Sequence, residues 1–514
     1  MTDAVLGRLM LAFDGFELPK PMAERLAAAP AAGVTLFRYR NVVDPAQVRR
    51  LTDALQRCAR ADEPMLVAID QEGGQLLGLG PGSTPFPGNM ALGAAGDSAL
   101  TERVGTAIGR ELRAVGVNVD YAPVADLATN PSNPSLGVRS FGDDPPRVAE
   151  HVAAFVRGLE GTGVAATLKH FPGKGEAGVD THHRLATVRR SRAGFARELA
   201  TFRAGLAAGA SVVMSGHFAA PALTGDDALP ATLSPAVMTG LLREELGFDG
   251  VAISDAFDMD ALSPGSGRLR DAIAGLNAGL DLLLLGGSSD VAAFEGALRD
   301  GVLRGAVDAR LNEAALGRVA ALRRRLAGFE QPDLAVVGGA EHAALAVEVA
   351  QRALTLLRDR DSLLPLRPAP GDRILAIMPR PADLTPADTS AGVRPGLAAA
   401  LRRRHPDVEE LLVEPAPSDV EIDAAVTRAR DADLLVIGSI SASLEPRQAA
   451  LVRALLEAGR PTVTAALRTP WDLSGYPAAG THACTYSIVE PSMEALAAGL
   501  FGEIGFAGRL PVAP

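Results

Sequence analysis

The feature that most constrains the fold is a regular alternation of short apolar runs and helical patterns over residues 1–328. The apolar runs are nearly continuous, which is typical of strands that are covered on both faces of a parallel sheet. The predicted strands are Leu9–Gly15, Gly33–Tyr39, Pro64–Asp70, Val117–Val124, Val164–His170, Ala210–His217, Gly250–Asp255 and Leu280–Gly286. Eight strands alternating with helices predict an α/β fold, with an N-terminal (β/α)8 TIM barrel as the first domain.

Helical patterns lie between these strands. The clearest are Glu102–Val115, Arg147–Leu159, Ser191–Ala208 and Ser234–Leu246. The last has the best-marked boundaries, because Ser234 can cap its N-terminus, Pro235 suits its first turn and Gly247 can end it.

A second set of alternating elements follows a predicted linker over residues 329–340. We expect residues 341–514 to hold strands at Ile374–Met378, Leu411–Val413, Leu434–Ser439 and Thr462–Leu467, with a helix from about Glu341 to Leu357 before the first strand and others between and after them. Because these strands are too few to close another barrel, the pattern predicts a C-terminal three-layer α/β sandwich. Trp471 follows the last of these strands, and we expect it to pack at an interface rather than to contact a ligand.

Composition excludes several classes of partner. The net charge of −11, without a cluster of cations and aromatics, argues against a nucleic-acid partner. Cys58 and Cys484 are far apart in sequence, and the adjacent His182 and His183 do not form a zinc motif, so we expect no metal and no cofactor. No apolar run is long enough to cross a membrane, and the Met1–Asp3 start lacks a basic region, so we expect a cytoplasmic protein without a signal peptide or membrane partner.

Polar residues follow the predicted barrel strands at the carboxyl ends, where TIM barrels place their active sites. They are Asp70 to Glu72, Asp120 to Asp126, Arg139, Lys169, His170, Met214 to His217 and Asp255. Any one of them could be a helix cap, since aspartate is a common N-cap residue. A complete ring of such residues at the strand ends is much harder to explain as helix caps, so we interpret this ring as a candidate site.

The segment Leu168–His183 is the most informative part of this ring. A buried strand ends at Pro172, and the loop after it contains three glycines and then Asp180 and His182, two positions apart. A glycine-rich loop that carries a carboxylate and an imidazole could close over a substrate and deliver an acid/base group. The alternative is an ordinary polar surface loop.

The combination of motifs resembles glycoside hydrolase family 3, in its β-N-acetylhexosaminidase branch. The residues that carry the resemblance are Lys169-His170-Phe171-Pro172-Gly173 with Asp180-Thr181-His182, Asp70-Gln71-Glu72-Gly73-Gly74, Arg139-Ser140-Phe141-Gly142, and Ala231 to Ser234 through Phe248-Asp249-Gly250 into Ser254-Asp255. The resemblance covers the whole predicted barrel.

This resemblance implies a retaining, exo-acting β-N-acetylglucosaminidase that acts on a small oligosaccharide or amino-sugar glycoside in cell-wall recycling. It implies Asp255 as the nucleophile of a covalent glycosyl-enzyme and an Asp180/His182 dyad as the acid/base. The positions that it implies for sugar binding are Asp70, Arg139, Lys169, His170 and His217. The dyad is chemically sufficient, because retaining hydrolysis needs a carboxylate and a proton donor, and a histidine held by a carboxylate can donate near neutral pH.

Departures from the branch leave alternatives open. Gln75 and Gly78 stand where arginines are common, and Lys174 stands where histidine is common, so the aglycone preference is undetermined. A glycoside phosphorylase is one alternative, since Lys174 and a histidine acid/base would tolerate an incoming phosphate. A family 3 β-glucosidase or β-xylosidase, with a glutamate acid from the second domain, is another. A non-catalytic glycan-binding protein is the third.

Overall fold

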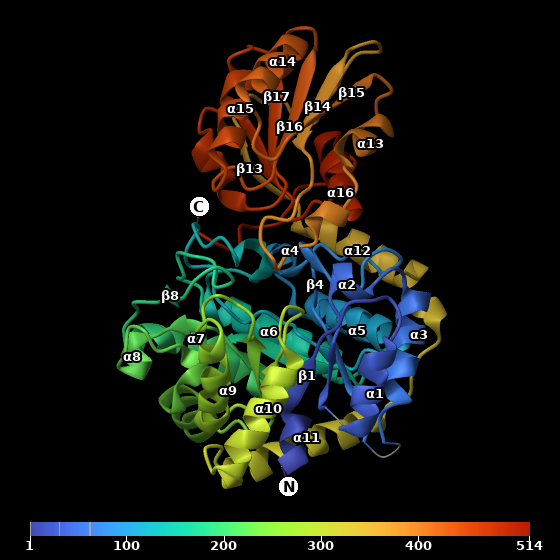
Figure 1. The fold of residues 1–514 in the computed structure, drawn as a ribbon. Helices are drawn as coiled ribbons and strands as arrows, with labels where there is room; N and C mark the ends of the chain where they lie inside the picture. The colour runs from blue at the N-terminus through green and yellow to red at the C-terminus, as the bar shows by residue number, and fades with distance from the viewer. Residues whose placement is uncertain (1, 30, 61–62, 514) are drawn as a thin grey trace.

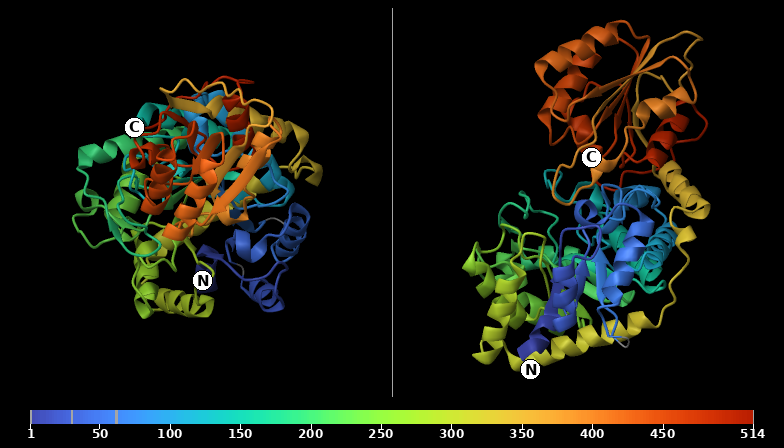
Figure 2. Two further views of the ribbon diagram at one scale, coloured as in Figure 1. Left: turned by 90° about the horizontal axis from the view of Figure 1, so that it is seen from above. Right: turned by 45° about the vertical axis from the view of Figure 1, so that its right-hand side comes forward.

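The computed structural model describes residues 2–29, 31–60 and 63–513, which form two bodies, each built around its own sheet. Figure 1 shows the first body below and the second above it, with the N-terminus at the far end of the first body. The C-terminal end of the described chain lies at the level of the boundary between the two bodies, as Figure 1 and the right-hand view of Figure 2 show.

The first body is a closed barrel of eight parallel strands, which confirms the predicted TIM barrel. Around the barrel the order is β1 (Leu9–Leu11), β12 (Leu282–Leu284), β11 (Val251–Ala256), β9 (Val212–Ser215), β7 (Ala165–Phe171), β6 (Val119–Asp120), β3 (Leu66–Ile69) and β2 (Gly33–Thr35). Most of the strands are shorter than predicted. The residues that follow them are apolar and buried as well, so hydrophobicity alone does not show where strand pairing stops.

Helices surround this barrel. They are η1 (Thr2–Arg8), α1 (Lys20–Ala28), α2 (Arg38–Asn41), α3 (Pro45–Gln56), α4 (Asn89–Ala95), α5 (Ser98–Ala114), η2 (Gly137–Arg139), α6 (Pro145–Glu160), α7 (Arg192–Ala207), α8 (Pro221–Thr224), η3 (Ala231–Leu233), η4 (Ala236–Glu245), α9 (Ser266–Ala278), α10 (Val291–Leu303) and α11 (Ala309–Ala327). Ser191 caps α7 by accepting a hydrogen bond from the amide of Gly194, as its residue type favours.

The helix over Ala236–Glu245 differs from its prediction. It has π-helical hydrogen bonding, and the side chain of Ser234 does not cap it. Ser234 contributes its main chain instead, because its carbonyl accepts from the amides of Val237 and Met238. The predicted side-chain cap is therefore wrong, although the helix itself is present.

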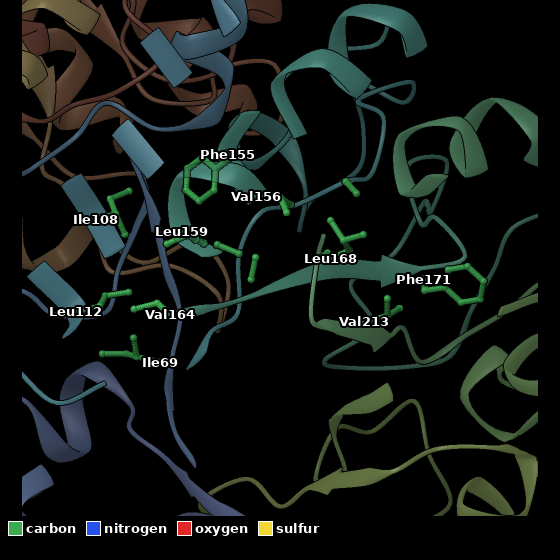
Figure 3. Packing of buried hydrophobic residues seen from close by; sticks show 14 of the residues in the cluster. Ile69, Ile108, Leu112, Phe155, Val156, Leu159, Val164, Leu168, Phe171 and Val213 are labelled. Atoms are coloured by element: carbon green, nitrogen blue, oxygen red, sulfur yellow. The ribbon is translucent and has the colours of Figure 1, made fainter. Parts of the chain in front are cut away.

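Two hydrophobic clusters hold the barrel strands in place. One fills the space between the strands and helices such as α5 and α6, where Ile108, Leu112, Phe155 and Leu159 lie on the helix side and Leu168 on the strand side (Figure 3). The other consists mostly of inward-facing strand residues, which include Met10, Leu66, Val119, Ala165, Val212 and Ile253. Strands buried on both faces provide a rigid base for the groups at their carboxyl ends.

The second body confirms the α/β sandwich. Its sheet has the order β13 (Thr355–Asp359), β18 (Thr481–Cys484), β17 (Thr462–Ala466), β16 (Leu434–Ser439), β14 (Ile374–Pro379) and β15 (Val408–Val413), and β13 is an antiparallel edge strand. Apolar clusters cover the sheet on both faces. Its helices are α13 (Leu397–Arg402), α14 (Asp419–Arg430), α15 (Pro446–Leu456) and α16 (Glu490–Leu500), with short turns η6 (Ser390–Gly392) and η7 (Pro470–Gly475).

The sequence prediction missed β13 and β18. β13 follows directly after α12 (Ala340–Ala353), and the predicted helix, which ran to Leu357, included the first three residues of this strand. β18 has the sequence Thr-His-Ala-Cys, which lacks the continuous apolar run expected of a central strand, although all four residues are buried.

Contacts between the bodies involve residues distant in sequence. Helix α12 packs against both α4 of the barrel and α16 of the sandwich. The indole Nε1 of Trp471 donates to the carbonyl of Ala513 at 3.0 Å, and its buried ring belongs to the large barrel cluster, so the expected interface role is confirmed.

We propose residues 329–340 as the linker, which a short turn, η5 (Leu334–Val336), interrupts. Among the helices of the described residues, none combines the length and apolarity that crossing a membrane requires.

Candidate active site

A cavity of about 530 Å³ opens at the carboxyl ends of the barrel strands. Its volume lies in the range of about 300–1,000 Å³ that is typical of small-molecule sites. Its inner half is lined by six of the predicted site residues: Asp70, Arg139, Lys169, His170, His182 and Asp255. The other two, Asp180 and His217, lie directly behind this lining, in contact with His182 and with the main chain beside Asp255.

A buried ionic cluster forms one wall of the inner half. The Nζ atom of Lys169, on β7, lies 2.6 Å from a carboxylate oxygen of Asp70 and 2.6 Å from one of Glu72. The guanidinium of Arg139 donates two hydrogen bonds to Glu72, at 2.7 and 2.9 Å. Because Glu72 is 2% exposed and bridges both cations, it fixes the positions from which they can reach a ligand.

The cluster predicts a dependence of stability on pH. Burial raises the pKa of Glu72, but Arg139 and Lys169 outweigh burial and lower this pKa from 4.5 to about 2. The stabilisation from this carboxylate is complete above pH 4.5 and is lost as the pH falls towards 2. The shift corresponds to about 3 kcal/mol. We therefore expect the difference in unfolding free energy between the wild type and Glu72→Gln to shrink by about that amount over this range.

Urea denaturation at several pH values between 5 and 2 would measure this difference. Glu17→Gln is the control, because Glu17 is also a glutamate but is exposed, and its difference from the wild type should stay nearly constant. A constant difference for Glu72→Gln would contradict the proposed electrostatic role.

A second buried carboxylate, Asp126, holds the start of the glycine-rich loop that carries Asp180 and His182. It accepts hydrogen bonds from Nδ1 of His170 at 2.7 Å and from the amide of Lys174 at 2.8 Å. Burial and the charges of Lys174, Arg139 and Lys169 lower the pKa of His170 well below its usual value, so the imidazole is neutral at pH 7. Its orientation, with Nδ1 bound to Asp126, leaves Nε2 as the nitrogen available to a ligand.

The glycines of this loop serve packing as well as flexibility. A side chain at Gly175 would collide with the carbonyl oxygen of Leu127, and one at Gly173 would collide with Glu198, whereas Gly178 has open space around it. Mobility of the loop therefore stays a prediction, and the packing limits it to the part after Gly175.

The two members of the predicted dyad are in direct contact. Nδ1 of His182 lies 2.6 Å from Oδ1 of Asp180, and the same oxygen accepts from the backbone amide of His182 at 3.0 Å. Burial raises the pKa of Asp180, but the hydrogen bond and the charge of His182 lower it to about 2, so the carboxylate is ionised at pH 7. The side chain of His182 is 20% exposed and lines the cavity, which allows Nε2 to exchange a proton with a bound molecule.

Asp255 stands near the carboxyl end of β11. Burial raises its pKa, but His217, Lys174 and His182 outweigh burial and place this pKa below the usual value, so the carboxylate is ionised. Its Oδ1 accepts from the amide of Ala256 at 2.8 Å, and Nε2 of His217 donates to the carbonyl of Ala256 at 3.2 Å. His217 therefore holds the main chain beside Asp255 and does not itself line the cavity.

Sequence reasoning did not assign some residues that line the cavity or lie behind its lining. Glu72 lies in one of the motifs quoted above, and Asp126 lies at the end of a predicted strand. Both form buried ionic contacts with residues from other strands, so the local sequence does not reveal these contacts. The outer half is lined by residues 37–40 of the barrel and by residues of the segment 383–389 from the second body, and no sequence pattern indicated their proximity. Over the described residues, no group of three or more histidine, cysteine, aspartate or glutamate side chains could hold a metal ion.

Comparison with known proteins agrees with this geometry. The model of the glycosyl hydrolase family 3 N terminal domain matches residues 8–322. The chain is 34% identical to beta-hexosaminidase A of Pseudoalteromonas piscicida over 380 residues, which are 68% of this chain and 63% of that protein, so less than two thirds of that relative is matched. It is 38% identical to a beta-hexosaminidase of Stenotrophomonas maltophilia (strain K279a) over 284 residues, 54% of this chain and 82% of that one.

Solved structures extend the similarity to both bodies. A glycoside hydrolase family 3 β-N-acetylglucosaminidase from Paenibacillus sp. str. FPU-7 is 35% identical and superposes with a TM-score of 0.93, covering 100% of this chain and 98% of that one. A beta-glucoside phosphorylase shares the fold, with a TM-score of 0.81 at 22% identity, covering 100% of this chain and 94% of that one. The strand-end residues, the barrel that positions them and these matches identify the chain as a member of glycosyl hydrolase family 3, a glycoside hydrolase.

Proposed function

We propose that this protein is a retaining, exo-acting β-N-acetylglucosaminidase that releases terminal β-linked N-acetylglucosamine. The observation that carries the proposal is the contact of Asp180 with His182 at a cavity that Asp255 also lines. Relatives named beta-hexosaminidase and a β-N-acetylglucosaminidase with the same two-body architecture support it. Among the described residues, the cavity lining includes no glutamate, which disfavours the β-glucosidase alternative with a glutamate acid from the second body.

In the proposed first step, the ionised carboxylate of Asp255 attacks the anomeric carbon and the glycosidic bond breaks. His182 donates the proton on Nε2 to the departing oxygen, and Asp180 stabilises the imidazolium before transfer. In the second step, neutral His182 takes a proton from water, which attacks the glycosyl-enzyme and releases Asp255. Two inversions at the anomeric carbon give overall retention.

The ionic cluster and His170 would bind the terminal sugar. Asp70 can accept hydrogen bonds from sugar hydroxyls, while Arg139, Lys169 and Nε2 of His170 can contribute donors or, for His170, an acceptor. Their mutual hydrogen bonds mean that these groups need little reorganisation when the sugar arrives, which lowers the cost of binding.

Turnover of an aryl β-N-acetylglucosaminide, compared with the matching aryl β-glucoside, tests the proposed function. We expect kcat/KM for the N-acetylglucosaminide to be the higher by at least about tenfold, the free-energy equivalent of one or two hydrogen bonds to the acetamido group. A higher value for the glucoside would contradict the proposal, and no turnover of either would favour a binding protein.

A second candidate is transfer of the sugar to phosphate. The observation that favours it is Lys174, which is 1% exposed and near enough to Asp255 and Asp180 for its charge to act on both, although its Nζ forms no hydrogen bond with the described residues. Repeating the assay with inorganic phosphate separates the reactions, because phosphorolysis would yield a sugar 1-phosphate instead of the free sugar.

A further inference from the structure

The segment of residues 176–190, which carries the predicted dyad and which we call the acid/base loop, is held at both ends. At its start, the side-chain amide of Asn133 donates to two consecutive main-chain carbonyls just before the loop, at 3.1 and 3.2 Å. Near its end, the short strand β8 (Ala186–Thr187) pairs with β10 (Phe218–Ala219), which follows barrel strand β9. The place of His182 therefore depends on how these two ends lie relative to each other.

The guanidinium of Arg190 joins the two ends. Arg190 is the last residue of the loop, and one of its terminal nitrogens lies 2.6 Å from a carboxylate oxygen of Glu176, the first residue. The same nitrogen donates to the hydroxyl of Thr129, in the segment between β6 and α6, at 3.1 Å. The other terminal nitrogen donates to Glu198, on α7, at 2.9 Å. One side chain thus closes the base of the loop and fastens this base to the barrel.

Glu198 holds the guanidinium from the barrel side. Its side chain is buried, and its second oxygen accepts from the amide of Leu127 at 3.0 Å. Burial and the charge of Asp126 raise the pKa of Glu198 to about 8. At pH 7 the negative charge that balances Arg190 is therefore that of Glu176, whose side chain is 42% exposed. The contact between Glu176 and Arg190 is the one that joins the ends of the loop.

The geometry of these contacts requires an arginine. A guanidinium presents its donors in a rigid planar fork, whereas lysine has a single ammonium group on a flexible stem. The side chain of Arg190 is 9% exposed, so salt screens its contacts less than it screens those of surface arginines. A lysine at position 190 would keep the charge but could not hold both carboxylates in the observed arrangement.

The middle of the loop carries the group whose position matters most. The carbonyl of His182 accepts from the amide of Asp260 at 3.2 Å, and Gly178 has open space around it, so this part of the loop can follow a shift of its base. A general acid must lie within about 2.6–3.2 Å of the oxygen that it protonates. A displacement of about 1 Å can cost about 10²-fold in rate.

We propose that Arg190 is a positioning residue for the acid/base step. By joining Glu176 to Glu198 it fixes the base of the loop, and through the loop it fixes the place of Nε2 of His182. Arg190 does not line the cavity, so it acts without touching the substrate. This inference rests on the proposed function, because it takes His182 as the proton donor.

The test measures kcat/KM for two N-acetylglucosaminides with different leaving groups, N,N′-diacetylchitobiose and the dinitrophenyl glycoside. This parameter covers the steps up to cleavage of the glycosidic bond, so deglycosylation does not enter it. We expect Arg190→Lys to lower the ratio of the disaccharide value to the dinitrophenyl value by about tenfold, because only the sugar leaving group needs a well-placed proton. A purely structural role would lower both values together and leave the ratio unchanged.

Glu176→Gln tests the other partner of this contact at an exposed position, where the substitution does not threaten folding. It should lower the same ratio by about threefold, the size expected for a partly exposed ion pair. In the double variant Arg190→Lys/Glu176→Gln the two losses should not add, since both substitutions disrupt one contact.

Arg189→Lys is the matched control, because Arg189 is the neighbouring arginine and its pair with Asp227 is exposed. Its ratio should equal that of the wild type. Unchanged ratios in both Arg190→Lys and Glu176→Gln would overturn this inference alone. If the wild type converts neither substrate, or if His182→Ala leaves the ratio unchanged, the proposed function or its proton donor is wrong, and the inference fails with it.

Discussion

Replacing Asp255 with alanine is expected to lower kcat for an N-acetylglucosaminide by at least about 10⁴-fold, since in the proposed mechanism Asp255 forms the glycosyl-enzyme. The side chain is near the end of a strand whose first four residues are buried, and its one described hydrogen bond goes to the adjacent amide. The variant should therefore keep the barrel, with a melting temperature close to that of the wild type, so that the loss is one of chemistry. Steady-state kinetics and thermal unfolding of the purified variant measure both quantities.

Asp260→Ala is the matched control for this experiment. Asp260 is an exposed aspartate five positions further along the chain, and it does not line the cavity. We expect its kcat to stay within about twofold of the wild type, as for most surface substitutions. In the wild type, a fluorinated sugar that slows deglycosylation should leave a covalent adduct on Asp255 that peptide mass spectrometry can locate. An adduct on another carboxylate would refute the assignment.

Replacing His182 with alanine should produce a loss that depends on the leaving group. A general acid contributes about 10²–10⁴-fold to the rate. A sugar leaving group needs the proton, so we expect a loss of that size on N,N′-diacetylchitobiose. A dinitrophenolate departs without protonation, so the first step with the dinitrophenyl glycoside should be nearly preserved. Pre-steady-state release of dinitrophenolate would measure that step without interference from deglycosylation.

Two further variants separate acid catalysis from binding. Asp180→Asn keeps the imidazole but removes its ionised partner at 2.6 Å, so it should show a milder form of the same leaving-group dependence. His183→Ala changes the exposed neighbour of His182 and should leave both substrates nearly unaffected. Equal losses on both substrates in His182→Ala would show that His182 binds the sugar and does not donate the proton.

The barrel could be predicted from the sequence because its signal is local and repeated. A strand covered on both faces, such as Leu66–Ile69, must be apolar at nearly every position that faces helices or the barrel interior, and a helix follows at regular intervals. The edge strand Thr355–Asp359 and the short strand Thr481–Cys484 escaped prediction, because tertiary contacts rather than a continuous apolar run hold them in the sheet.

The candidate catalytic groups were also predictable, because their order along the chain follows the strand order of the barrel. Asp180 and His182 are two residues apart, so their contact depends on local geometry. The role of Glu72 was not predictable, because its significance lies in its distance from Arg139 and Lys169, which are 67 and 97 positions away in the chain. Only the closed barrel brings these three groups together.

By itself, the sequence determined the two α/β architectures, the family and the set of candidate site residues, since each depends on local patterns or short motifs. The tertiary structure alone decided what forms the outer half of the cavity. Thr389 meets Gln75 from more than 300 positions away, and Tyr39 meets Asp383 across the boundary between the two bodies. Contacts of this kind depend on how two separately folded sheets dock, and the residues on each side carry no periodic or motif signal of their partner.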